Sequence, residues 1–207
     1  MQIGIIGYGD LGKQLRSFLQ QQYPDAVFTV FDDYTSVAEG AVVAPFDAYQ
    51  QAAYAAHQLY IGLGYKHLAK REGLVTSINS TQLKPFVHPS VVQGADVQVG
   101  AGSFAYPGAI LDHQAIIGKG VLINNAVVVS HETIIGDATY VSPGVVICGK
   151  AQIGKRCFIG AGAIISNGVS IGDDVVVGIG SVITKNVPSG ASVIGNPMRF
   201  TDKLNVL

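Results

Sequence analysis

The chain has 207 residues, of which 48% are hydrophobic and 13% are charged, and its formal net charge is −1. This composition excludes a disordered chain, and the small net charge offers no basic field for nucleic acid or anionic lipid. No apolar run reaches the roughly 20 residues that a membrane-spanning helix needs, and the first residues lack the basic segment of a signal peptide. Since the two cysteines, Cys148 and Cys157, form no disulfide framework, we expect a cytoplasmic protein with reduced thiols.

The first predicted elements follow the order of a nucleotide-binding fold. An apolar strand at residues 2–6 leads into a glycine-rich turn at 7–12 and a helix, and a second strand at 27–31 ends in two carboxylates. The spacing from the last glycine of the turn to the first carboxylate is the one found in dinucleotide-binding folds. Glycines let the backbone approach a phosphate, and a helix N-terminus favours its negative charge. The candidate ligand contacts are Gly7, Gly9, Asp32 and Asp33.

The remainder of this first region is short. A third strand is expected near residues 59–63, after a helical stretch at 49–57. Only about 80 residues precede the repeats described next, which is room for one mononucleotide-binding half instead of two. A sugar carried by a nucleoside diphosphate therefore fits this region better than NAD, and an NAD-dependent oxidoreductase is disfavoured. The structural alternative is a glycine turn that only packs a helix on a sheet.

A six-residue period organises the second half of the chain. Of the seventeen residues at every sixth position from Val87 to Ile183, fifteen are Val, Ile or Leu, and the residue four places after each is small or β-branched. Neither helix nor strand periodicity produces this pattern. It predicts a triangular solenoid, in which the aliphatic residues fill the bore, the small residues lie at corners, and three hexads close one coil. Glycine often follows the aliphatic residue, where we expect it to supply backbone conformations that a side chain forbids.

A Rossmann-like region followed by hexapeptide repeats resembles the family of sialic acid O-acetyltransferases (NeuD) and PglD-like sugar acyltransferases. The resemblance implies an α/β Rossmann-like domain at residues 1–84 that binds a sugar nucleotide. It also implies a left-handed parallel β-helix at residues 85–207, with a C-terminal tail, that binds acetyl-CoA between the subunits of a homotrimer. The motifs that carry it are Gly7-Tyr8-Gly9-Asp10-Leu11-Gly12, Phe31-Asp32-Asp33, Ile61-Gly62-Leu63-Gly64, Val87-His88-Pro89-Ser90 and Ser130-His131-Glu132-Thr133-Ile134-Ile135-Gly136-Asp137.

The resemblance also implies roles for individual residues. His131 would be the catalytic base and Glu132 its carboxylate partner, while Asn124 would face the sugar. The backbone N–H of Gly149 would meet the thioester oxygen. Tyr140 departs from the pattern, because some relatives carry a second histidine there, near the acyl-CoA.

The repeat itself supports these roles independently. Residues 18 apart should stack in adjacent coils, so Gly149 is expected one coil above His131, about 5 Å along the axis. A glycine there leaves room for a thioester beside the imidazole. Lys185 is expected three coils above His131, roughly 14 Å away, and is a candidate contact to a CoA phosphate. Its alternative is a solvated surface lysine. The full column is His113, His131, Gly149, Asn167 and Lys185.

The pairing of His113 with His131 raises the question of a metal. Trimeric left-handed β-helix carbonic anhydrases use three histidines split between subunits, but here no third histidine lies close to the pair. Zinc normally needs at least three protein ligands, so no metal is predicted. We expect His113 to be a polar corner residue near the acceptor sugar.

The predicted function is acetyl-CoA-dependent N-acetylation of the amino group of a nucleotide-linked deoxyamino sugar. Transfer is expected to be direct, because Cys157 falls in the inward column and Cys148 has no evident base beside it. One alternative is O-acetylation of a sialic acid or another sugar hydroxyl. A second is a nucleotide-binding solenoid module without catalysis, and a third is a purely structural solenoid.

Overall fold

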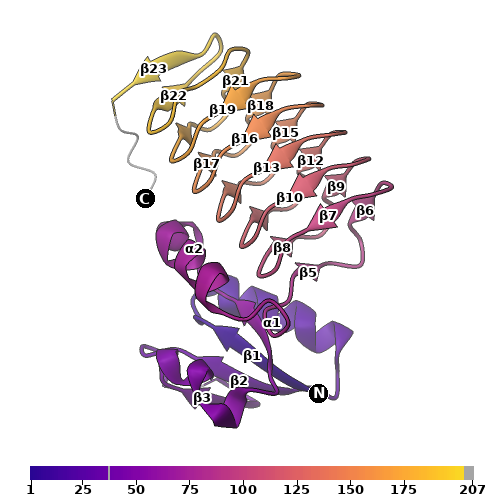
Figure 1. Ribbon diagram of the computed structural model, residues 1–207, viewed down its shortest axis with the longest axis vertical. Helices are drawn as coiled ribbons and strands as arrows, with labels where there is room; N and C mark the ends of the chain where they lie inside the picture. Colours follow the sequence, from indigo (N-terminus) through magenta and orange to yellow (C-terminus); the bar gives the residue numbers. More distant parts are fainter. Residues whose placement is uncertain (37, 203–207) are drawn as a thin grey trace. The chain divides into compact units, whose positions relative to one another are not determined.

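The computed structural model describes residues 1–36 and 38–202, and the chain forms two compact units, Met1–Lys84 and Pro85–Leu207. The first unit is a parallel sheet with helices, and the second is a solenoid of stacked coils (Figure 1). In the described part of the chain, every helix is too short or too polar to cross a lipid bilayer.

The sheet of the first unit is parallel throughout, in the order β3-β2-β1-β4. Its strands are β1 (Gln2–Ile6), β2 (Val27–Phe31), β3 (Ala41–Ala44) and β4 (Gln58–Ile61). Helix α1 (Asp10–Gln22) follows the glycine turn as predicted, and it buries Leu15 and Leu19. A second helix, α2 (Leu68–Ser77), follows β4 and the short 3-10 turn η3 (Tyr65–His67).

Two predictions for this unit are corrected by the structure. The strand expected near residues 59–63 is the fourth, because the short strand β3 was missed. The helix expected at 49–57 is two 3-10 turns, η1 (Phe46–Gln50) and η2 (Ala52–Tyr54), separated by the extended residue Gln51. Nucleation of a short α-helix is unfavourable. The packing of aromatic rings therefore determines the conformation of this segment. The Tyr54 ring, for example, packs edge-on against Phe31 with centroids 4.9 Å apart.

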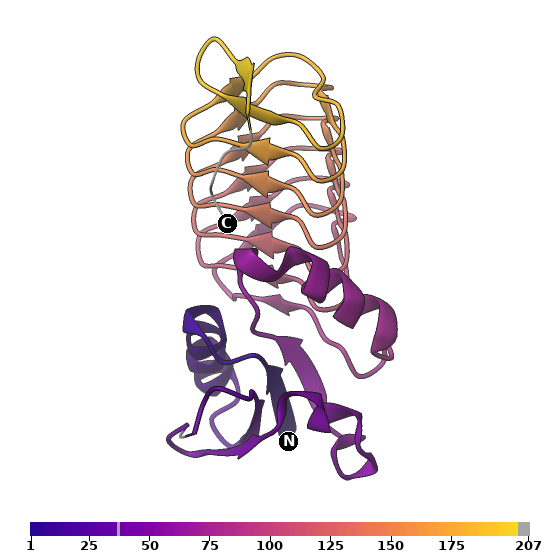
Figure 2. The same cartoon turned by 90° about the vertical axis from the view of Figure 1, so that its left-hand side faces the viewer.

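The second unit is built from short strands, two residues long except for the three-residue β22 and β23, which stack into three sheets that are parallel apart from β23 (Figure 2). The first sheet holds β5 (Phe86–Val87), β8 (Phe104–Ala105), β11 (Leu122–Ile123), β14 (Tyr140–Val141), β17 (Phe158–Ile159), β20 (Val176–Val177), β22 (Ser192–Ile194) and the antiparallel β23 (Arg199–Thr201). The second sheet holds β6 (Val92–Gln93), β9 (Ile110–Leu111), β12 (Val128–Val129), β15 (Val146–Ile147), β18 (Ile164–Ile165) and β21 (Val182–Ile183). The third sheet holds β7 (Gln98–Val99), β10 (Ile116–Ile117), β13 (Ile134–Ile135), β16 (Gln152–Ile153) and β19 (Ser170–Ile171).

The inward columns predicted from the repeat are confirmed. The second residue of each strand points into the bore, where for example Leu111, Ile147 and Ile165 are fully buried. Burying such a side chain contributes about 1.5–3 kcal/mol relative to leaving it exposed. Gln93 is an exception and is exposed, because it lies in the first strand of its sheet and has a neighbouring strand on one side only.

The prediction that the repeat glycines supply a special backbone conformation is wrong. None of the glycines directly after the aliphatic position has a positive φ; instead they are packed against the next coil. A Cβ on Gly136 would lie 2.6 Å from the carbonyl carbon of Gly154. The left-handed residue is the fourth of each hexad, from Asp96 to Gly180, whether or not it is glycine. The coil therefore imposes this conformation even on residues that adopt it at a cost.

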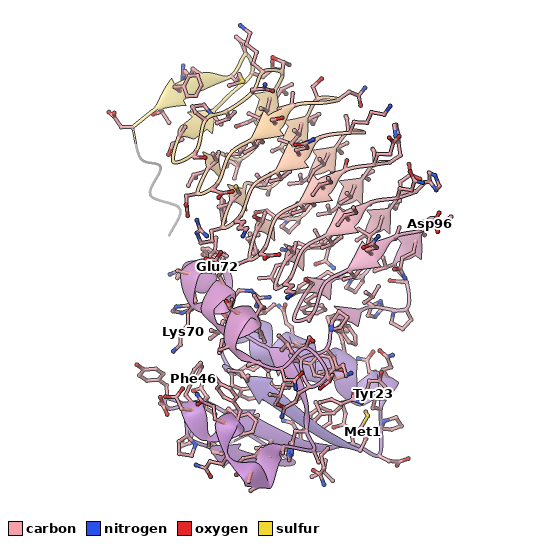
Figure 3. All side chains as sticks on the ribbon, viewed as in Figure 1. Met1, Tyr23, Phe46, Lys70, Glu72 and Asp96 are labelled. Atoms are coloured by element: carbon pink, nitrogen blue, oxygen red, sulfur yellow. The ribbon has the colours of Figure 1, made fainter. Side chains whose placement is uncertain are left out.

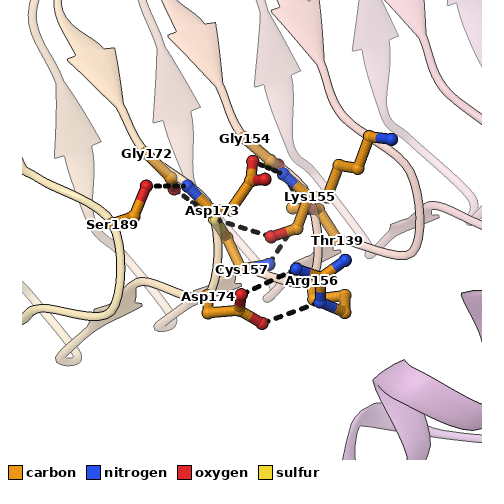
Figure 4. Close-up of polar contacts among 9 residues, drawn as sticks. All are labelled: Thr139, Gly154, Lys155, Arg156, Cys157, Gly172, Asp173, Asp174 and Ser189. Carbon is orange, nitrogen blue, oxygen red and sulfur yellow. Dashed lines mark hydrogen bonds and ion pairs between the residues drawn. The ribbon is translucent and has the colours of Figure 1, made fainter.

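Polar side chains join the coils at the corner between the third and first sheets (Figure 4). The buried hydroxyl of Thr139 donates to Gly154 O at 2.8 Å and accepts from Cys157 N at 3.0 Å. Outside the bore, Arg156 binds Asp174 through two hydrogen bonds of 2.8 and 2.7 Å. These bonds and the Arg156 charge hold the pKa of Asp174 below its ordinary value. Each polar group inside the corner is thereby satisfied without interrupting the stack.

The six-residue period ends after Ile183. Val187 bridges to Ile171, so the offset between coils falls from 18 residues to 16, and Val187 takes a strand position instead of the predicted corner. Asn186 Oδ1 accepts the Ser170 amide at 2.9 Å, in place of a backbone carbonyl. A groove of about 650 Å³ lies on the third sheet beside this shortened coil. Its lining includes Ile134, Gln152, Ser170, Asn186 and Ser189.

The stability of the first unit should depend on pH through His57. This buried side chain has Nε2 3.2 Å from Thr29 Oγ1, its Nδ1 has no partner, and burial lowers its pKa. The unfolded chain then binds a proton at His57 more readily than the folded chain does. The contribution of neutral His57 to the free energy of unfolding is therefore complete above its ordinary pKa of 6.5 and is lost as the pH falls through the lower pKa of the folded state. The thermal unfolding midpoint should therefore fall less on acidification in His57→Gln than in the wild type. The exposed His67, changed to Gln, is the control, and equal acid sensitivity in all three proteins would contradict the assignment.

Candidate active site

His131 and Glu132 lie at the corner between the second and third sheets, after β12. His131 Nδ1 is 3.1 Å from Glu132 Oε1, and Lys150 Nζ is 3.8 Å from the same oxygen. With Nδ1 facing the carboxylate, the tautomer that carries its proton on Nδ1 can donate to Glu132, and its lone pair is then on Nε2. The φ of Glu132 is +57°, which is the ordinary value for the fourth place of a hexad and not a local strain.

The imidazole of His131 lies directly over Gly149 in the next coil. A Cβ built on Gly149 would be 2.4 Å from His131 Nε2 and 2.6 Å from Cε1, so any other residue would displace the ring. The amide of Lys150 donates to His131 O at 2.9 Å and holds the two coils in this register. The predicted stacking of these two residues is confirmed.

The Gly149 N–H is a free donor beside this ring. In each coil the amide at the third place of a hexad makes no ladder bond, and side chains cap some of these amides, as Asp137 does for Lys119 and Asp173 does for Lys155. Among residues 1–36 and 38–202 no acceptor bonds to the Gly149 amide. A fixed donor next to a base is the arrangement that stabilises a developing oxyanion.

The other predicted solenoid residues lie apart from this pair within one chain. Asn124 is buried at the corner between the first and second sheets, where Nδ2 donates to Val141 O at 2.9 Å. Tyr140 faces outward from the first sheet, and its ring stacks on Phe158 at 5.4 Å. Lys185 is exposed at the turn that begins the shortened coil.

His113 lies in the coil before His131 and is exposed. Its carbonyl accepts the Glu132 amide at 2.9 Å, which continues the same ladder. In the described residues, no three His, Cys, Asp or Glu side chains gather in a way that would hold a metal ion.

In the first unit the two predicted carboxylates are engaged by backbone amides. Asp32 Oδ2 accepts the Tyr8 amide of the glycine turn at 2.8 Å, and Oδ1 accepts Tyr34 and Thr35. Burial opposes the ionised form, but these bonds outweigh it and lower the pKa of Asp32. Asp33 Oδ1 accepts the Phe46 amide at 2.8 Å. The sequence did not reveal that these carboxylates tie the ends of β1, β2 and β3 together.

The turns after β1 and β4 pack against each other at the carboxyl edge of the sheet. A Cβ on Gly62 would lie 2.2 Å from Gly7 O, and a Cβ on Gly12 would lie 2.3 Å from the same oxygen. Between β2 and β4, strand β1 is the point where the strand order reverses, and ligands of open α/β sheets bind in the crevice there. At the same edge, Lys70 Nζ lies 3.7 Å from the Phe46 ring centroid (Figure 3).

Comparisons with known proteins agree with the repeat and the fold. A family model described as bacterial transferase hexapeptide (six repeats) matches residues 132–167, and one described as hexapeptide repeat of succinyl-transferase matches residues 150–185. A search of curated proteins found no match.

Several solved structures are similar over nearly the whole chain. A histidine-to-asparagine mutant of perosamine N-acetyltransferase from Caulobacter crescentus, in complex with CoA and GDP-perosamine, is 26% identical with a TM-score of 0.85, and 98% of each chain is covered. The acetyltransferase domain of PglB from Neisseria gonorrhoeae FA1090, in complex with acetyl coenzyme A, is 25% identical with a TM-score of 0.76, covering 97% of this chain and 98% of that one. WeeI from Acinetobacter baumannii AYE is 27% identical with a TM-score of 0.71, covering 97% and 100%.

The fold is thus an α/β unit with a parallel sheet followed by a left-handed parallel β-helix, and the predicted fold class is confirmed. Residues 132–185 match models of hexapeptide-repeat transferases, and the resemblance to sugar acyltransferases predicted from the sequence is confirmed by the similar structures.

The position of the His131 imidazole can be tested by substituting Gly149. In Gly149→Ala the new Cβ would overlap His131 Nε2, so the ring must move, and we expect turnover to fall by about tenfold or more. The melting temperature should change little, because the side chain added faces solvent-exposed His131. The control is Asn167→Ala, one coil further along the column, which should leave turnover unchanged. Wild-type turnover in a folded Gly149→Ala protein would contradict the role assigned to the position of the His131 ring over Gly149.

Proposed function

We propose that this protein is an acetyl-CoA-dependent N-acetyltransferase that acts on the amino group of a nucleotide-linked deoxyamino sugar. Its class, an acyl-CoA-dependent sugar acetyltransferase, rests on the family and on the similar structures with CoA and GDP-perosamine. One observation carries the proposal for the site. The imidazole of His131 lies over Gly149, whose amide has no acceptor in the described chain.

In the proposed reaction the sugar amine attacks the thioester carbon directly. His131 Nε2 takes a proton from the amine as the N–C bond forms, and Glu132 favours the resulting imidazolium. The Gly149 N–H donates to the oxyanion of the tetrahedral intermediate. The C–S bond then breaks, and the proton held by His131 passes to the departing CoA sulfur. No acyl-enzyme forms, so the amide product and the free CoA thiol both arise from the breakdown of this tetrahedral intermediate.

The groove on the third sheet fits the path of the acyl-CoA. It begins at Ile134, three residues after His131, and extends to Asn186 in the shortened coil. An extended pantetheine arm in this groove would bring the thioester to His131 and place the CoA phosphates near Lys185. The lysine would then contribute a charge-assisted contact to a phosphate.

A homotrimer would cover the outer face of the second sheet. Every outward residue of that sheet is aliphatic, and the exposed fractions of Val92, Ile110 and Ile164 are 61%, 40% and 42%. Contiguous exposed aliphatic surface of this kind marks an interface. In a trimer the corner that carries Asn124 in one chain would approach the corner that carries His131 in the next, so that Asn124 reaches the sugar. His113 would lie near the same acceptor.

The first unit would hold the sugar nucleotide. Its diphosphate fits the turn that contains Gly7 and Gly9 at the N-terminus of α1, where backbone amides and the helix dipole favour negative charge. Asp32 and Asp33 each retain acceptor capacity beyond their bonds to backbone amides, which would suit ribose hydroxyls.

The decisive assay monitors free thiol when the protein is mixed with acetyl-CoA and a panel of UDP-, dTDP- and GDP-linked amino sugars. Thiol release with one of them, and an N-acetylated product, are expected. Release only with hydroxyl acceptors would replace N- by O-acetylation. Nucleotide binding without any thiol release would leave a binding module and contradict the proposal.

Removal of the base should abolish most of the activity. We expect His131→Ala to lower kcat by about 10²-fold or more, since general acid–base help of this size is lost. Glu132→Gln should have a smaller effect on kcat, because the base remains but its imidazolium loses the carboxylate. His113→Ala is the comparison variant, because this histidine of the same column would lie near the acceptor and should affect KM for the acceptor while lowering kcat far less than His131→Ala does. Near-normal turnover in His131→Ala would remove the assigned base.

Direct transfer predicts that both thiols are dispensable. Burial raises the pKa of Cys157 to about 11, so this thiol should stay unmodified in the folded protein, whereas the half-buried Cys148 should react slowly. Cys148→Ala should retain wild-type kcat, and mass spectrometry of the enzyme after mixing with acetyl-CoA alone should detect no acetyl adduct. An adduct on Cys148, with loss of activity in the variant, would establish a covalent route instead. Two free thiols also fit the reducing cytoplasm that we propose as its location.

A further inference from the structure

A fully buried arginine lies beneath the crevice of the first unit. Arg71, in α2, is 0% exposed and is the largest fully buried side chain of the described residues. Burial of a cation is costly unless hydrogen-bond acceptors surround it. Nη1 of Arg71 donates to Leu63 O at 2.7 Å and to Ile61 O at 3.2 Å.

Both of these carbonyls belong to the end of β4 and the turn that follows it. This turn forms one wall of the crevice where the strand order reverses. The opposite wall is the glycine turn after β1. The two walls touch, because the Leu63 side chain fills the place where a Cβ of Gly7 would be, with Cδ2 2.4 Å away. Gly7 has a φ of +88°, so its conformation is one that few other residues would keep.

We propose that Arg71 is a positioning residue for the diphosphate of the sugar nucleotide. By holding Leu63 O, the guanidinium fixes the Leu63 side chain against Gly7, and this contact keeps the amides of the turn after β1 directed at the crevice. The diphosphate then lies between the turns at residues 7–9 and 62–64. This inference rests on the proposed function of the first unit and adds the residue that maintains the shape of its site.

The chemistry of arginine explains why no smaller cation serves equally well. One nitrogen of the planar guanidinium, Nη1, donates to both carbonyls from a fixed plane, whereas a lysine ammonium is a compact point charge on a flexible stem. Arg71→Lys should therefore preserve part of the function. Arg71→Met keeps much of the volume and removes the donors, and replacing a buried charge by an apolar residue often leaves a protein folded.

The test is calorimetric titration of the full-length protein with UDP, dTDP and GDP, followed by steady-state kinetics with the corresponding amino sugar. For the nucleotide that binds the wild type, Arg71→Met should raise Kd by about tenfold or more, and Arg71→Lys by less. KM for the sugar nucleotide should rise in parallel, with kcat and KM for acetyl-CoA close to wild type. The control is Leu74→Ala, which removes a buried side chain from the same helix and leaves the guanidinium contacts intact.

The outcomes separate the inference from the proposed function. Wild-type affinity in folded Arg71→Met, or equal weakening in Leu74→Ala at a similar melting temperature, would overturn the positioning role alone. Failure of the wild type to bind any of the three nucleotides would overturn the binding site itself and the inference with it. If Arg71→Met does not fold, Leu63→Ala keeps the arginine and removes only the contact with Gly7. It should weaken nucleotide binding as well, and unchanged binding would overturn the inference.

Discussion

The register of the solenoid sets each residue beside the one 18 positions later, and this stacking brings the His131 ring onto the Cα of Gly149. The contact requires that Gly149 lack a side chain, because a Cβ would lie 2.4 Å from Nε2. It is held by the aliphatic bore and by the ladder bond from Lys150 N to His131 O. The position of His131, the proposed base, is thus a property of the whole stack and not of a local loop.

The same coil geometry supplies the second element of the proposed site, a free backbone donor. Since the third residue of each hexad makes no ladder bond, every coil offers an unpaired amide, and the structure caps some of them with Asp137, Asp173 or Ser189. Among the described residues, no acceptor caps the Gly149 amide. The first unit follows a related principle, because Gly7 and Gly62 let two turns approach more closely than side chains would permit. In both units, close backbone packing shapes the proposed ligand sites.

Much of this could be predicted from the sequence, because a strict six-residue period has few physical realisations. The inward columns and the stacking of His131 on Gly149 followed from counting alone. Three features did not. Glycine follows the aliphatic position because the neighbouring coil leaves no room for a side chain, and counting within one coil cannot reveal this contact. The break after Ile183 depends on Asn186 replacing a carbonyl. Arg71 carries no motif, since only the fold shows which carbonyls it meets.

A crystal structure of the protein with CoA tests the account most directly. We expect the pantetheine arm in the groove on the third sheet, with its sulfur beside His131 Nε2 and within reach of the Gly149 amide. The imidazole should keep its place over Gly149 and its contact with Glu132. A CoA sulfur bound at another corner of the solenoid, or an imidazole turned away from Gly149 in the complex, would contradict the central claim.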